Sequence, residues 1–121
     1  MLKKLFLLIL FSIIILPAKA GEFENALNTD KPVFLYINTS WCGSCKKFNP
    51  IYNDTVKNYS SKFKFVKLDA DTDYGNKIAE RHNVRYIPYA ALFKPKSTTP
   101  HKLSYSCMMN YACMNKTLKN F

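Results

Sequence analysis

The chain has 121 residues, with 18 Lys and Arg against 8 Asp and Glu and a formal net charge of +10. This length allows one compact domain with a single core, and the sequence has no internal repeat, low-complexity tract or second domain. The lysines are scattered along the chain and no nucleic-acid-binding motif accompanies them, so they indicate a solvated basic surface and exclude an obvious nucleic-acid-binding protein.

The first twenty residues predict a signal peptide. Lys3 and Lys4 precede an apolar run over 5–16, and residues 18–20 have the small-x-small pattern of a cleavage site. The run is too short to cross a bilayer, which needs about 20 helical residues, although an uncleaved anchor is the alternative. Cleavage would leave 15 basic and 8 acidic residues in 21–121, together with all four cysteines. We therefore expect a periplasmic or secreted protein in an oxidising compartment, where disulfides persist.

The first elements of the expected domain are a short helix and a buried strand. Residues 22–28 predict the helix, and the unbroken apolar run 33–37 predicts a strand covered on both faces. A longer helix is expected to begin near Cys42, with Thr39 or Ser40 as its N-cap.

The long helix carries its apolar residues at spacings of three and four, which predicts a core-facing stripe. The stripe consists of Phe48, Ile51, Tyr52, Val56 and Tyr59. Pro50 lies inside this pattern and predicts a kink, because proline lacks an N–H and clashes with the preceding turn.

A second strand is expected over 63–68, and since no hairpin turn separates it from the first, the unit is a parallel, right-handed crossover. Residues 71–82 then predict a helix capped by Thr72 or Asp73. Its inward-facing residues are Ile78 and Ala79.

The last third of the chain predicts two more strands and a final helix. The strands are expected over 89–93 and 102–105, with a Pro- and Thr-rich loop over 95–100 between them. Asn110 is a suitable N-cap for a helix that runs to Phe121.

The motif Trp41-Cys42-Gly43-Ser44-Cys45-Lys46 lies where the first strand passes into the long helix. Two thiols three positions apart at the start of a helix can close a disulfide and reopen it. Unpaired N–H groups and the positive end of the helix dipole stabilise a thiolate there, and the thiolate is the nucleophile. A metal site is the alternative for Cys-x-x-Cys, but a strand before it and a crossover after it favour redox chemistry. The motif therefore predicts disulfide exchange.

Three further features follow the motif along the chain. Pro50 comes five residues after Cys45, Lys67 lies in the second predicted strand, and 84–88 contains the pair Ile-Pro. Together these features resemble the thioredoxin family over nearly all of 21–121. The resemblance implies an α/β thioredoxin-like fold, with a central mixed sheet of four to five strands flanked by helices and a cis-proline beside the cysteines.

The same resemblance implies roles for individual residues. Cys42, as the exposed cysteine, attacks a client disulfide, and Cys45, one turn deeper, resolves the mixed disulfide. Ile87 offers backbone groups that pair with the client chain, and Pro88 keeps the site open. The residues expected to flank the client groove as apolar contact surface are Trp41 and Tyr89.

The sequence also departs from the family pattern. The family often has a buried acid six residues before the first cysteine, where this chain has Tyr36. Without that carboxylate, Lys67 beneath the site would lack a partner and favour thiolates, while deprotonation of Cys45 would be slower. Ser44 stands where the family usually has proline, so the family's reduction potential does not carry over to this chain, and Tyr89 stands where a threonine is common, which would reshape the client groove. The residues expected to tune the site are Gly43, Ser44, Tyr36 and Lys67.

A second cysteine pair, Cys107 and Cys113, lies outside the family pattern. If Asn110 caps the last helix, the chain can fold back and bring the two Cα atoms within the ~5.5 Å that a disulfide prefers. One interpretation is a staple that ties the helix to the last strand. Another is a dithiol at the rim of the active site that exchanges electrons with Cys42. A third is a Cu(I) site built from sulfur ligands, namely Cys107, Met108, Met109, Cys113 and Met114.

These features predict an exported thiol–disulfide oxidoreductase that exchanges disulfides with protein clients. We expect a monomer with no cofactor, no resident metal and no nucleic-acid partner. A reductive role outside the cytoplasm would also require a membrane redox partner. The alternative is a copper-handling module on the same fold, which uses the Cys and Met ligands.

Overall fold

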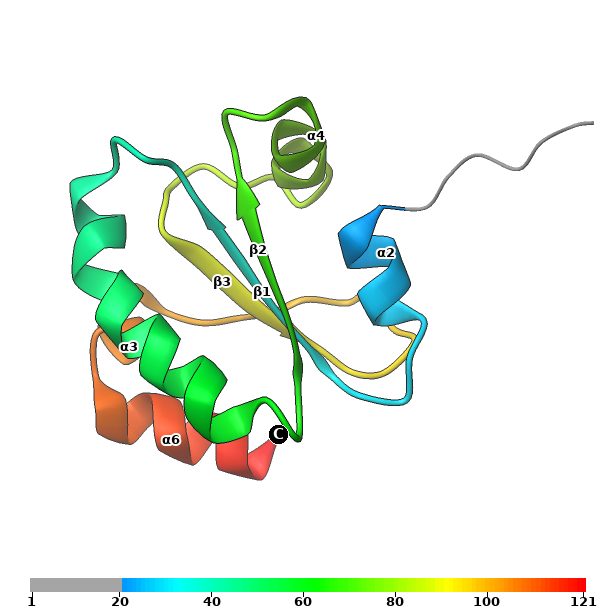
Figure 1. Cartoon of the computed structure of the whole chain (residues 1–121), viewed down its shortest axis with the longest axis vertical. Coiled ribbons are helices and arrows are strands. Elements are labelled where there is room, and N and C mark those ends of the chain that lie inside the picture. The colour runs from blue at the N-terminus through cyan, green and yellow to red at the C-terminus, as the bar shows by residue number, and fades with distance from the viewer. Residues whose placement is uncertain (1–20) are drawn as a thin grey trace, which may run out of the picture.

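A four-stranded mixed sheet forms the centre of the fold (Figure 1). The structure, a computed structural model, describes residues 21–121, and the predicted signal peptide over 1–20 lies outside the described residues. The strands are β1 (Val33–Asn38), β2 (Lys64–Asp69), β3 (Tyr89–Phe93) and β4 (His101–Lys102), in the order β2-β1-β3-β4. β1 and β2 are parallel, whereas β3 is antiparallel to β1 and to β4. The expected parallel crossover between the first two strands is confirmed.

Helices cover both faces of this sheet (Figure 1). They are α2 (Glu22–Leu27), α3 (Gly43–Tyr59), α4 (Asp73–Arg81), α5 (Tyr105–Met108) and α6 (Tyr111–Asn120). α3 and α6 pack on one face and α2 and α4 on the other. No helix within 21–121 is long and apolar enough to cross a membrane.

β1 lies between the two hydrophobic cores, which explains its unbroken apolar sequence. Successive side chains of a strand point to opposite faces. Phe34 and Tyr36 therefore enter the core under α3 and α6, while Val33, Leu35 and Ile37 enter the core under α2 and α4. All five are fully buried, as the sequence predicted for a strand covered on both sides.

The start of α3 differs from the expectation. Neither Thr39 nor Ser40 caps this helix; Cys42 is the N-cap, and its Sγ accepts a hydrogen bond from the backbone N–H of Cys45. The physical reason is a turn before the helix, in which the carbonyl of Thr39 accepts from the N–H of Cys42 and delays the first helical residue to Gly43. The helix then continues through Pro50 to Tyr59 without a break.

The fourth strand is also shorter than predicted, and the expected strand over 102–105 is wrong. β4 has only two residues, and Ser104 ends it by capping α5, accepting a hydrogen bond from the N–H of Cys107 at 3.2 Å. Tyr105 is therefore helical. The predicted caps Thr72 and Asn110 are confirmed, each accepting from the N–H three residues on.

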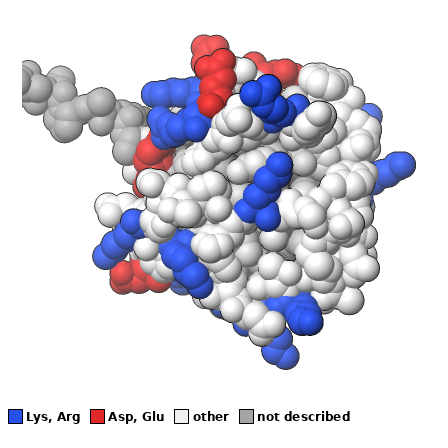
Figure 2. All heavy atoms as spheres, turned by 180° about the vertical axis from the view of Figure 1, so that it is seen from behind, with Lys and Arg blue, Asp and Glu red and all other residues white. Residues whose placement is uncertain are grey.

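Basic side chains are spread singly over the face shown in Figure 2, and acidic side chains gather toward its margins. This distribution agrees with a solvated basic surface. It gives no single basic stripe of the kind that tracks a nucleic-acid backbone.

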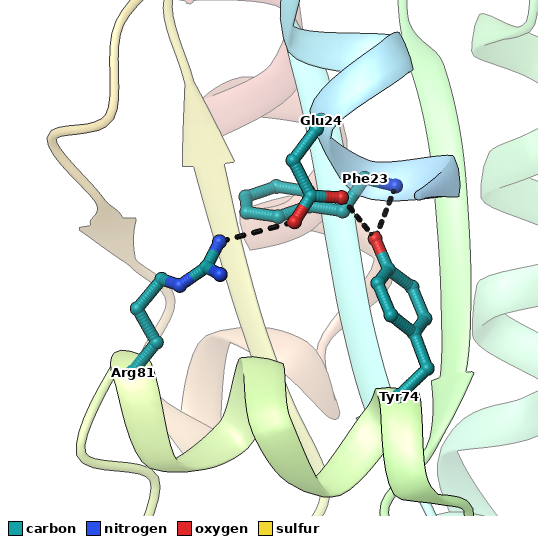
Figure 3. Close-up of polar contacts among 4 residues, drawn as sticks. All are labelled: Phe23, Glu24, Tyr74 and Arg81. Atoms are coloured by element: carbon teal, nitrogen blue, oxygen red, sulfur yellow. Dashed lines mark hydrogen bonds and ion pairs between the residues drawn. The ribbon is translucent and has the colours of Figure 1, made fainter. Parts of the chain in front are cut away.

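A polar network fastens α2 to α4 (Figure 3). The Glu24 carboxylate accepts hydrogen bonds from the Tyr74 hydroxyl and, at 3.1 Å, from Nη1 of Arg81. The Tyr74 hydroxyl in turn accepts a hydrogen bond from the N–H of Phe23 at 2.9 Å. Burial raises the pKa of Glu24, but the hydrogen bonds from Tyr74 and Arg81 outweigh it and leave the pKa below 4.5. The ionised carboxylate is thus stabilised more in the folded than in the unfolded chain.

Replacing Glu24 by glutamine is expected to lower the free energy of unfolding by roughly 0.5 kcal/mol at neutral pH, since the network is partly exposed. A lowered folded pKa contributes stability that is complete above the unfolded value of 4.5 and is lost as the pH falls through the folded value. The difference from the parent should therefore shrink in acid. Urea unfolding at a series of pH values measures it, with Glu22→Gln in the same exposed turn as control. A difference that does not change with pH would contradict the assignment.

Candidate active site

Cys42 and Cys45 form a disulfide across the first turn of α3, with their Cα atoms 5.2 Å apart. The N-cap position puts Sγ of Cys42 3.1 Å from the backbone N–H of Cys45. When the disulfide is reduced, a thiolate on Cys42 would lie at the positive end of a 17-residue helix, with this N–H directed toward it. The local backbone therefore supplies the electrostatics that the sequence predicted.

Both sulfurs are largely covered in the disulfide state. Cys42 is 6% exposed and Cys45 1%. The expectation that Cys42 is an exposed residue is wrong for this state, because its side chain folds back onto the first turn of α3, where Sγ is bonded to Cys45. Cys42 nevertheless remains the more accessible of the two.

Ile87 and Pro88 lie at the same end of the sheet as the cysteines. The motif follows the carboxyl end of β1, and Pro88 directly precedes β3, whose first residue Tyr89 pairs with Ile37 near the end of β1. Because β3 runs antiparallel to β1, the loop before β3 and the loop after β1 meet at one edge of the sheet (Figure 1). The Ile87–Pro88 peptide bond is cis.

Trp41 and Tyr89 differ in exposure, although both were expected to be contact surface. Trp41 is 69% exposed, and its Nε1 donates to Oδ2 of Asp71 at 2.8 Å. Tyr89 is only 5% exposed, and burial raises the pKa of its hydroxyl. The expectation that Tyr89 offers contact surface to a client is therefore wrong for most of its side chain. As a strand residue, Tyr89 packs into the core beneath α4.

Tyr36 takes the position of the buried acid and forms a polar contact beneath the motif. Its hydroxyl donates to Oδ1 of Asn49 at 2.8 Å and lies 3.5 Å from the carbonyl oxygen of Cys45. Burial raises the pKa of Tyr36 to about 12. A phenol with this pKa is neutral near pH 7 and cannot serve as a base there. The sequence offered no direct sign of Asn49, although it lies one helical turn after Cys45.

Tyr36→Phe is expected to lower the free energy of unfolding by about 1 kcal/mol, because the partly buried amide of Asn49 loses its donor. It should also reduce the loss of stability above pH 10, since the unfolded chain releases the Tyr36 proton at about 10.0 and the folded chain at about 12. Guanidinium unfolding at neutral and alkaline pH measures both effects. Tyr52→Phe is the matched control, a buried tyrosine of the same core. Because burial also raises the pKa of Tyr52 to about 12, the two variants differ only at neutral pH, and equal losses there would contradict the role of the Tyr36–Asn49 bond.

Lys67 faces the aromatic side chains next to this contact. It pairs with Tyr36 across β1 and β2, and its Nζ lies 5.7 Å from the ring centre of Tyr36 and 5.8 Å from that of Tyr52. Lys67 is an exposed residue, so water reaches its ammonium group. Cation–π attraction, and not a carboxylate, holds this side chain.

Cys107 and Cys113 form a second disulfide, with Cα atoms 5.2 Å apart. It joins α5 to α6, so the expectation that a staple would tie the final helix to the last strand is corrected: the partner segment is a helical turn. The two sulfurs are therefore not thiolate ligands in this state. Within 21–121, no three His, Cys, Asp or Glu side chains are grouped as a metal site.

Comparison with known proteins places these features in a family. The thioredoxin family model matches residues 14–112. Thioredoxin M4 of Arabidopsis thaliana chloroplasts is 35% identical over 70 residues, which are 58% of this chain and 35% of the relative. The thioredoxin of Mycoplasmoides gallisepticum is 27% identical over 85 residues, or 70% of this chain and 82% of the relative. This chain spans 35% of the length of the Arabidopsis relative and 64% of the length of thioredoxin 1 from Nostoc.

Solved structures give the same result for the fold. Oxidised mitochondrial thioredoxin 3 of Saccharomyces cerevisiae superposes with a TM-score of 0.67 at 25% identity, over 83% of this chain and 88% of that one. Oxidised thioredoxin of Plasmodium falciparum gives 0.66 at 24% identity, over 84% and 91%. With the family model, the helix-capping cysteine pair and the four-stranded sheet in agreement, this chain belongs to the thioredoxin family.

Proposed function

We propose that this protein is a thiol–disulfide oxidoreductase that acts on protein clients. The observation that carries the proposal is the position of Cys42, whose sulfur caps α3 and is bonded to Cys45 one turn away. A sulfur at a helix N-terminus has a stabilised thiolate, and a second sulfur within bonding distance can release what the first one captures.

In the reductive direction, the Cys42 thiolate attacks one sulfur of a client disulfide, and the other client sulfur leaves as a thiolate that takes a proton from solvent. The Cys45 thiol then loses its proton, and its thiolate attacks Sγ of Cys42. The second client sulfur leaves, and the protein becomes the disulfide form. The client gains two electrons, which the two cysteines supply. The oxidative direction is the same sequence in reverse.

Client binding is proposed for the edge of the sheet where the two loops meet. The backbone of Ile87 pairs with an extended client segment, Pro88 keeps the site open, and Trp41 supplies apolar surface. The high exposure of Trp41 supports this role, since large exposed aromatic side chains often mark interaction sites.

The replacement of a buried acid by Tyr36 bears on the resolving step. Near neutral pH the Tyr36 phenol keeps its own proton, because burial raises its pKa to about 12. Cys45 would therefore lose its proton to solvent, and the step would be slow compared with one assisted by a carboxylate. We infer that the protein differs in this step from relatives with the acid.

We also propose that the protein is exported to the periplasm or secreted, as a monomer, after removal of residues 1–20. The charged, apolar and small-residue pattern of that segment supports this proposal, as does the second disulfide. A reductive role there would require a membrane electron carrier. Expression of the full chain in bacteria, fractionation and mass measurement test it: a periplasmic product that begins at Gly21 is expected. A cytoplasmic product of full mass contradicts export.

The activity itself is tested with the purified protein comprising residues 21–121. We expect it to accelerate insulin reduction by dithiothreitol, or the oxidative refolding of a reduced disulfide protein, above the rate without it. Equilibration against glutathione, with thiols counted by mass, then gives the reduction potential of the first pair. Absence of catalysis in both directions would contradict the proposed function.

A further inference from the structure

A groove lies between the loop that precedes β3 and the segment from β4 to α5. It encloses about 430 Å³. One wall is the loop with Tyr86, Ile87 and Pro88, and the other is formed by β4 and α5 through residues such as Lys102 and Tyr105. This volume lies in the range of sites that hold a small ligand, so it fits one or two side chains and not a folded domain.

The groove lies next to the place where a client disulfide would react. Ile87 and Pro88 line it and also form the loop that meets the cysteine motif at the edge of the sheet. When a client cysteine reaches Cys42, the residues next to it in the client chain would therefore lie in the groove. The groove is in this sense part of the client site, on its β3–β4 side.

The walls combine exposed aromatic surface with one positive charge. Tyr86 is 81% exposed and Tyr105 53%. Lys102 is the only charged side chain among the lining residues, and within 21–121 it has no ion-pair partner. Its Nζ lies 5.8 Å from the ring of Tyr89, the largely buried residue that also lines the groove.

The opposite side of the motif carries a negative charge. Asp71, held by Trp41, follows β2, and the strand order β2-β1-β3-β4 places β2 and β4 on opposite sides of β1. Lys46 directly follows Cys45 and Arg85 directly precedes Tyr86, both exposed, so the surface around the cysteines is basic except on the side of β2, where Asp71 lies. An extended client segment that crosses it would meet a carboxylate on one side and an ammonium group on the other.

We propose that this groove selects clients with an Asp or Glu on one side of the reacting cysteine, and that Lys102 is the residue that determines the preference. The client carboxylate pairs with Nζ of Lys102, and an adjacent apolar side chain lies between Tyr86 and Tyr105. The proposal rests on the proposed function, because it names the substrate class of the same site. An exposed ion pair of this kind contributes up to about 1 kcal/mol, or about a fivefold change in rate constant.

The test uses peptides with one cysteine held as a 2-thiopyridyl disulfide. The Cys42 thiolate attacks the peptide sulfur and releases pyridine-2-thione, and Cys45 then frees the peptide thiol as the protein disulfide forms. Each peptide carries one Glu, Gln or Lys. This residue is placed at one of the three positions before the cysteine or at one of the three positions after it. For the prereduced parent in a single turnover, we expect the second-order rate constant of pyridine-2-thione release to be about threefold higher for Glu than for Gln, on one side only. Equal values for Glu and Gln at every position would overturn the proposal.

Charge reversal at Lys102 gives the decisive comparison. Lys102→Glu should prefer the Lys peptide over the Glu peptide at the same position, and Lys102→Met should show no preference. Lys77→Glu is the matched control, because it makes the same change in net charge at an exposed position of α4 that does not line the groove. An equal effect of Lys77→Glu would show that net charge alone acts, which would overturn the role of Lys102.

A binding measurement separates this proposal from the proposed function. Serine-containing versions of the peptides cannot react, and Trp41, the single tryptophan, reports their binding by fluorescence. If the parent binds the Glu peptide more tightly than the Gln peptide, and Lys102→Met loses this difference, the result supports the role of the groove even if no peptide is reduced. Failure of every activated peptide to react would contradict the oxidoreductase proposal instead. Sedimentation of the parent as a dimer that Lys102→Glu dissociates would assign the groove to a second copy and overturn the client proposal.

Discussion

Replacing Cys42 by serine is expected to abolish turnover of a disulfide client, with a fall in kcat/KM on the order of 10³-fold or more, because the nucleophile is lost. Replacing Cys45 by serine should have a different result. Cys42 can still attack, but nothing resolves the mixed disulfide, so the variant becomes covalently joined to its client. The mixed disulfide is on Cys42, and the low exposure of this residue, 6%, limits the access of a second thiol that could release the client.

The measurement is insulin reduction for both variants, followed by nonreducing electrophoresis and intact mass. Ser44→Ala, between the two cysteines, is a suitable control because it keeps both sulfurs, and it should form no lasting adduct. Full turnover by Cys42→Ser would contradict the assignment of the nucleophile. An adduct that forms in Cys42→Ser and not in Cys45→Ser would mean that the two roles are reversed.

Removing the second disulfide is expected to lower the free energy of unfolding by about 2 kcal/mol, in the variant with both Cys107 and Cys113 changed to alanine. The cross-link closes a short loop, with a sequence separation of 6, and in the chain-entropy model such a loop restricts the unfolded chain by about this amount. For a domain of this size the melting temperature should fall by about 10 °C. Guanidinium unfolding and a thermal scan, both without reductant, measure the two quantities.

The same variant distinguishes a staple from a redox relay. If the bond only joins α5 to α6, insulin turnover per folded molecule should stay within about twofold of the parent, measured well below the melting temperature. A stable variant that has lost turnover would instead support electron exchange with Cys42. The single variant Cys113→Ala gives a further control, since it leaves the buried Cys107 as a free thiol.

Local patterns in the sequence were sufficient for most of the fold. The run 33–37 predicted a strand buried on both faces, and it lies between the two cores as β1. Helix signals at Thr72 and Asn110 correspond to real caps, because capping depends on a side chain and an N–H only three residues apart. The errors were also local: a competing turn at Thr39 and a cap at Ser104 displaced two boundaries.

The sequence by itself determined the family, the order of elements and the position of Cys42 and Cys45 at a helix start, because each depends on spacing along the chain. Only the tertiary structure decided what surrounds them. The Tyr36–Asn49 bond, the Trp41–Asp71 bond and the groove bordered by Lys102 join residues separated by 13 or more positions. Such contacts depend on strand order, register and crossover, which fix neighbours in space that no pattern of adjacent residues records.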